Sequence, residues 1–164
     1  MARHGIGSAV VVVVAVAALG GTGTAVAGAG TAMTMVPLDN QIKQCDLVTT
    51  TYELTYGSAS GFVDVGAPDS GSVRAEVHMQ TALPDSTYQV RLVQVPRSLA
   101  ATCNPGDAGV AAGVMYIDGL GNGSTTVTSP RMPGATGAGV IVEGPPRPGR
   151  LHGDIYTSSY IAAI

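Results

Sequence analysis

A strict alternation of apolar and polar side chains between residues 72 and 95 constrains the fold most. Successive side chains of a β-strand point to opposite faces, so this pattern predicts strands with one buried face. Pro84 in the "LPDS" segment suits the second position of a turn. We therefore predict an antiparallel hairpin in which Ala82 pairs with Thr87 and His78 faces Arg91. The apolar positions are Val73, Ala75, Val77, Met79, Tyr88, Val90 and Leu92.

Shorter segments along the chain repeat this signal. Val and Thr are frequent, and Gly and Pro interrupt the chain at short intervals, which is typical of short strands joined by turns. We expect an all-β fold, a single antiparallel β-sandwich of about eight strands, either immunoglobulin-like or superoxide-dismutase-like. The segment 96–113 reads as a long irregular loop and 145–150 as a Pro-rich turn. The further expected strands are 47–56, 61–67, 114–118, 124–129, 137–144 and 154–162.

The first residues have the pattern of an export signal. The apolar run from Ala9 to Leu19 would span roughly 17 Å as a helix, too short for the ~30 Å core of a bilayer. Glycines and the small residues of "AVA" follow it, as at a signal peptidase site. We predict a signal peptide at 1–27, cleaved after Ala27, with Ala29 as the alternative. A flexible lead-in at 28–44 and a β-sandwich domain at 45–164 would follow.

Cys45 and Cys103 are the only cysteines. In the oxidising compartment implied by export, we expect them to form a disulfide, since no C-x-x-C spacing indicates a redox site. No cysteine directly follows the apolar run and Arg3 stands alone, so neither a lipid anchor nor twin-arginine export is indicated. The expected location is secreted or in the cell envelope, with no membrane span after cleavage.

The charge of the chain argues against some partners. Without the signal peptide, seven Arg and Lys face eleven Asp and Glu, a net charge of −4, and no basic run is present. Nucleic acid binding is therefore not expected.

His78 could take part in metal binding. Imidazole and thioether groups suit copper, and Met79 is adjacent to His78. Neighbouring strand residues point to opposite faces, however, so His78 and Met79 cannot hold one ion without a bulge. An exposed histidine on the sheet is the favoured interpretation, and copper binding through His78 is kept as an alternative.

His152 and Asp154 could supply a base and its orienting carboxylate. Ser158 or Ser159 would then be the nucleophile of a small secreted hydrolase. The "HGD" segment also fits an ordinary turn, and no G-x-S-x-G motif is present. "DGLGNG" at 118–123 lacks the later ligands of a calcium loop and reads as a hairpin turn.

Taken together, the export signal, "LPDSTYQVRLVQV", the later Cys103, the "GLGNG" turn and the closing "YTSSYIA" resemble small exported β-sandwich proteins of actinobacteria, including mycobacteria. The resemblance implies a sandwich fold and no assigned activity. The histidine cluster of copper-zinc superoxide dismutases is absent here.

These patterns favour a non-enzymatic exported protein that binds a partner or contributes structurally to the envelope. We assign no catalytic residue, cofactor or metal ligand, and we expect the partner to be a protein or another envelope component. The expected contact surfaces are the 96–113 loop and the segment 145–150, because recognition usually resides in loops on a rigid scaffold.

Overall fold

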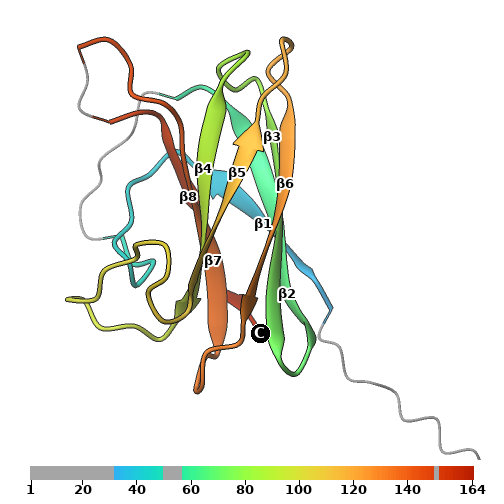
Figure 1. Ribbon diagram of the computed structural model, residues 1–164, viewed down its shortest axis with the longest axis vertical. Helices are drawn as coiled ribbons and strands as arrows, with labels where there is room; N and C mark the ends of the chain where they lie inside the picture. The colour runs from blue at the N-terminus through green and yellow to red at the C-terminus, as the bar shows by residue number, and fades with distance from the viewer. Residues whose placement is uncertain (1–31, 50–56, 150–151) are drawn as a thin grey trace, which may run out of the picture.

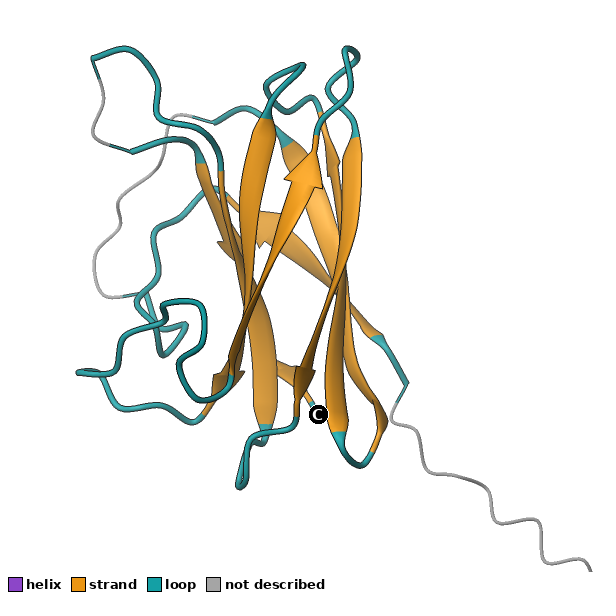
Figure 2. Ribbon diagram, viewed as in Figure 1, coloured by secondary structure: helices purple, strands orange, loops and turns teal. Residues whose placement is uncertain are grey.

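The computed structural model describes residues 32–49, 57–149 and 152–164, which form strands and connecting loops (Figures 1 and 2). None of these segments contains a helix that is long and apolar enough to cross a membrane. The strands are β1 (Thr34–Asp39), β2 (Ser60–Asp69), β3 (Ser72–Gln80), β4 (Thr87–Val95), β5 (Val110–Tyr116), β6 (Gly123–Pro130), β7 (Gly137–Glu143), β8 (Ile155–Ser158) and β9 (Ala162–Ala163).

The strands form one antiparallel sheet that curls until it is nearly closed, like a barrel (Figure 1). Its order is β5-β4-β7-β8-β1-β2-β3-β6, and β9 adds to β7. β1 joins the two halves, since Thr34–Pro37 pairs with β2 whereas Leu38 and Asp39 pair with β8. At the ends of the path, the Thr125 hydroxyl on β6 donates to the carbonyl of Val114 on β5 at 3.0 Å. The predicted all-β antiparallel class is confirmed.

The predicted hairpin between β3 and β4 is wrong. β3 pairs with β2 and β6, and β4 pairs with β5 and β7. His78 therefore lies opposite Phe62 and Ser124, not opposite Arg91. Both strands place their apolar faces in the same core, so the two faces meet across the interior. The 81–86 connection crosses between the two halves of the sheet.

β1 corrects the predicted lead-in at 28–44. Val36 is fully buried and Met35 is exposed, which is the alternation of a half-buried strand. The mixture of small residues made this segment read as a lead-in, and Pro37 has no amide hydrogen to donate to a neighbouring strand. It lies at the end of the pairing with β2, just before β1 passes to β8.

The strand predicted at 47–56 is only partly within the described residues. Leu47, Val48 and Thr49 lie in a turn and a loop. Residues 50–56 lie outside the described part of the chain. The predicted closing strand at 154–162 is divided between β8 and β9.

The main core fills the inside of the curled sheet. The alternating residues of β3 and β4 all point inward, as the sequence predicts, with Val77 and Leu92 fully buried. Each such side chain contributes about 1.5–3 kcal/mol through its removal from water. The other core residues include Val36, Val63, Val65, Met115, Val140, Val142 and Tyr156.

A second, smaller core lies on the outer face of β4 and β7. Val93 and Ile141 point outward from these strands, yet both are buried. Leu47 and Cys103 cover them from the neighbouring loops. This explains why β7 reads as a nearly continuous apolar run: its side chains are buried on both faces.

Candidate functional site

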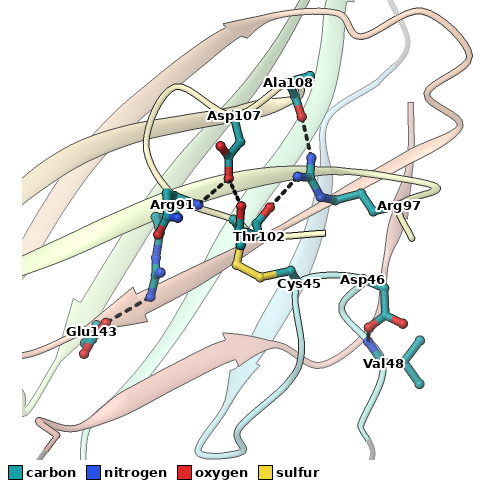
Figure 3. The surroundings of a disulfide bond; sticks show 11 residues. Cys45, Asp46, Val48, Arg91, Arg97, Thr102, Asp107, Ala108 and Glu143 are labelled. Atoms are coloured by element: carbon teal, nitrogen blue, oxygen red, sulfur yellow. Dashed lines mark hydrogen bonds and ion pairs between the residues drawn. A yellow bond between two sulfur atoms is a disulfide. The ribbon is translucent and has the colours of Figure 1, made fainter. Parts of the chain in front are cut away.

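A disulfide between Cys45 and Cys103 ties two loops together on the outer side of β4 and β7 (Figure 3). The sulfur atoms are 2.07 Å apart, and the two cysteines are 58 residues apart in the sequence. The predicted bridge is therefore confirmed. It holds the 45–48 turn against the loop at 96–109.

The 96–109 loop is held by its own hydrogen bonds (Figure 3). The Arg97 guanidinium donates to the carbonyls of Ala108 and Thr102. The Asp107 carboxylate accepts from the Thr102 hydroxyl at 2.7 Å and from the Asn104 amide at 2.8 Å. These hydrogen bonds lower the pKa of Asp107, and the bond from the Thr102 hydroxyl has the largest effect. The predicted irregular segment is thus an ordered loop that ends where β5 begins, at Val110.

A groove of about 280 Å³ lies beside this loop. Val48 on the disulfide turn and Ile161 before β9 are large apolar residues that remain 50% and 41% exposed. Asp46 and Arg97 bring opposite charges to the same groove. The full lining is Asp46, Val48, Val95, Pro96, Arg97, Thr136 and Ile161.

An ion pair between a buried carboxylate and a partly exposed arginine lies near the start of β4, at the other end of this strand from the groove. Asp154 is only 3% exposed, and its Oδ2 accepts from the Arg147 guanidinium at 2.5 Å. The Tyr88 hydroxyl also donates to this oxygen, at 3.4 Å. Arg147 belongs to the predicted Pro-rich turn. That turn therefore supplies the counter-ion of a buried carboxylate.

Two buried tyrosines beside this ion pair give the protein a predicted alkaline limit. Burial raises the pKa of Tyr156 to about 12 and also raises that of Tyr88. An unfolded tyrosine ionises near pH ~10, so the unfolded state loses these protons first. Stability should therefore hold below pH ~10 and fall as the pH rises from there to about 12.

Urea denaturation at a series of pH values measures this effect. The Tyr156→Phe protein should lose less stability across the same range, whereas Tyr116→Phe should behave as wild type because Tyr116 is 75% exposed. An equal alkaline loss in Tyr156→Phe and wild type would contradict the assignment.

The residues of the predicted hydrolase are not brought together. His152 is exposed, and no hydrogen bond or ion pair joins it to Asp154, whose carboxylate binds Arg147 and Tyr88. Ser158 is buried, and its hydroxyl accepts from the Val140 amide at 2.8 Å. Ser159 is partly exposed. Neither serine is hydrogen-bonded to His152.

His78 lies on the outer face of β3, as predicted, and stacks on Phe62 of β2. The ring centroids are 4.8 Å apart and the planes differ by 22°. Met79 points into the core and is 1% exposed, so it lies on the opposite face from His78. Within the described ranges, no three His, Cys, Asp or Glu residues gather as metal ligands would.

The "GLGNG" segment forms a turn between β5 and β6. The Asp118 carboxylate accepts hydrogen bonds from the amides of Leu120 and Asn122. These bonds stabilise the turn. Gly121 has a φ of 86°, a backbone conformation that favours glycine. The predicted turn is confirmed, but among the described residues β5 and β6 form no strand pair with each other, so the predicted hairpin is wrong.

Two features of these sites were not predicted from the sequence: the outward position of Phe62 and the groove. Phe62 precedes the buried Val63 and lies two residues before Asp64, so its outward position could be read from the alternation. The groove had no such signal. Val48 and Ile161 meet only through the disulfide and the return of the chain at β9.

Comparison of the chain with protein-family models, with curated proteins and with solved structures finds no match.

Proposed function

We propose that the protein is an exported, non-enzymatic binding module whose partner is a protein of the cell envelope or its surroundings. Removal of residues 1–27 would precede folding of the mature chain. The bridged Cys45 and Cys103 are compatible with an oxidising compartment outside the cytoplasm. In this proposal the nearly closed sheet is a flattened immunoglobulin-like sandwich, and its source is actinobacterial, as the sequence resemblance implies.

The observation that carries this proposal is the apolar groove beside the disulfide. Its volume of about 280 Å³ is just below the ~300–1,000 Å³ of sites for drug-sized ligands. A groove of this size suits one apolar side chain of a partner protein. Asp46 and Arg97 can pair with polar groups of the partner around that side chain.

The disulfide supports binding because it fixes the groove in advance. Ordering a loop on binding costs about 0.5–1.5 kcal/mol for each immobilised side chain. Here the bridge and the Arg97 and Asp107 hydrogen bonds already hold the loop. Val48 and Ile161 are exposed apolar residues that lie together on this rigid surface, and such surfaces are typical of protein interaction sites.

A charged residue in the groove should weaken partner binding. In Val48→Asp and Ile161→Asp, a carboxylate would lose its water on binding, next to the like charge of Asp46. The Arg97 guanidinium already donates to two carbonyls, so it offsets only part of this cost. We expect affinity to fall at least tenfold, which is about 1.4 kcal/mol. Enrichment of partners from the envelope fraction, quantified by mass spectrometry, measures this loss. Thr126→Asp on the exposed face of β6 is the matched control and should retain wild-type enrichment.

Equal enrichment of the same partners by the Ile161→Asp and Thr126→Asp proteins would contradict the placement of the site. Thermal denaturation of each variant separates loss of binding from loss of folding. Both groove positions are substantially exposed, so the variants should unfold at nearly the wild-type temperature.

A further inference from the structure

β2 and β3 lie on the other half of the sheet from the disulfide loops (Figure 1). A second hollow lies on the outer face of these two strands. Its volume is about 200 Å³. The strand register places Phe62 opposite His78 and, as the next outward pair, Ser60 opposite Gln80. The stacked rings therefore border one side of the hollow, and the hydroxyl and amide border the other. Its lining is Ser60, Gly61, Phe62, His78 and Gln80.

Phe62 occupies an unusual place for its residue type. It is the only phenylalanine of the chain, yet it points outward from β2 while Val63 and Val65 fill the core. A large apolar ring gains most stability when it is buried. On this face the Phe62 ring is only partly covered, by stacking on His78. The ring is therefore available to a ligand.

The other groups that line the hollow are neutral hydrogen-bonding groups. The Ser60 hydroxyl can donate and accept, and the Gln80 amide offers two donors and an acceptor. Both side chains are exposed, and neither forms a hydrogen bond with another described residue. Ser124 of β6, opposite His78, adds a further hydroxyl at the margin. An apolar peptide side chain would leave these groups unpaired, which costs affinity.

The charges on this face argue against an anionic ligand. Asp64 and Glu76 lie directly opposite each other and form the next outward pair after Phe62 and His78. Arg74 pairs with Glu76, so it offsets only part of this negative charge. A phosphate or carboxylate in the hollow would be repelled by this pair.

We propose that this hollow binds one sugar ring of a neutral saccharide. A sugar ring has a face of C–H groups, which can pack on the negative face of an aromatic ring, and a rim of hydroxyl groups. The C–H face packs against the face of Phe62 that is not stacked on His78, and the hydroxyls pair with Ser60 and Gln80. The volume is below the ~300–1,000 Å³ of larger ligand sites, so only one ring of a longer glycan enters.

This site goes beyond the protein-binding groove and is independent of it. The two lie on different halves of the sheet and share no lining residue. Together they would let the protein hold a glycan on one side and a protein partner on the other.

Titration of the isotope-labelled, disulfide-bonded protein with neutral saccharides tests the proposal by amide NMR. The probes are glucose, galactose, mannose, arabinose and N-acetylglucosamine, with a linear oligosaccharide of each. At least one probe should produce saturable shifts centred on residues 60–62, 78–80 and 124. The Phe62→Leu protein retains an apolar side chain but lacks the ring, and its affinity should fall at least tenfold.

Met35→Ala is the matched control, because Met35 is exposed on the same face, opposite Asp64, but does not line the hollow. This variant and Ile161→Asp should both bind the saccharide as wild type does. The proposal is overturned if no probe produces saturable shifts, if the shifts centre elsewhere, or if Phe62→Leu binds equally well. A variant is folded if its amide shifts outside this face match those of the wild-type protein.

Discussion

Replacement of both bridged cysteines by alanine should lower the free energy of unfolding by about 4 kcal/mol. The cysteines are 58 residues apart, and a cross-link that closes a loop of this length lowers the conformational entropy of the unfolded chain by an amount worth about 4 kcal/mol. The variant also loosens the cover of the second core, since Leu47 and Cys103 are held against β4 and β7 by the bridge. Guanidinium denaturation of the double variant and of wild type, without reductant, measures the difference.

The matched control for this experiment is Thr102→Ala. It removes one hydrogen bond of the same loop while the bridge remains, and a typical hydrogen bond contributes about 0.5–1.5 kcal/mol. A double cysteine variant that is no less stable than Thr102→Ala would show that the disulfide does not hold the fold in the way described.

Replacement of Arg147 by methionine should destabilise the protein by about 3 kcal/mol. The Asp154 carboxylate would remain buried without its cation, and loss of one partner of a buried ion pair typically costs 3–5 kcal/mol. The lower end applies because Arg147 itself is 41% exposed and Tyr88 still donates to the carboxylate. Urea denaturation at neutral pH provides the measurement.

Arg74→Met is the control for the ion pair. Its carboxylate partner, Glu76, is 35% exposed, so water replaces the lost cation at a cost of about 0–1 kcal/mol. Equal effects of Arg147→Met and Arg74→Met would contradict the importance of burial at Asp154. The Arg147→Met, Asp154→Leu double variant should recover part of the loss, because it removes the buried charge.

The sequence predicts the faces of the strands better than their neighbours. The alternation in β3 and β4 correctly places Val77 and Leu92 inside, because a period of two determines which face is buried. It contains no information on whether consecutive strands pair in one sheet or face each other across a core. The "LPDS" turn fits both arrangements locally, so the predicted register of His78 with Arg91 failed.

Segments that depend on tertiary cover were also difficult to predict. β1 contains Pro37, which reads as a strand breaker, yet its pairing passes from β2 to β8 at that point. The second core arises because loops far apart in the sequence cover Val93 and Ile141. Alternation alone would have placed these two residues on a wet face.

Of the candidate sites, the sequence predicts the disulfide but neither the groove nor the ion pair. The number of cysteines and the export signal predict the disulfide, because only one pairing exists within the chain. The groove requires Val48 and Ile161 to meet, and the ion pair requires the Pro-rich turn to fold back over Asp154. Such meetings are set by the path of the loops, and no local pattern around these residues indicates them.

The central claim is that the protein acts outside the cytoplasm with its loops fixed by the Cys45–Cys103 bridge. Mass spectrometry of the protein isolated from its native culture, alkylated without reductant, tests this most directly. The account predicts a chain that begins at Gly28, or at Gly30, with the two cysteine peptides joined and neither thiol alkylated. A chain that retains the first 27 residues and carries two alkylated cysteines would contradict it.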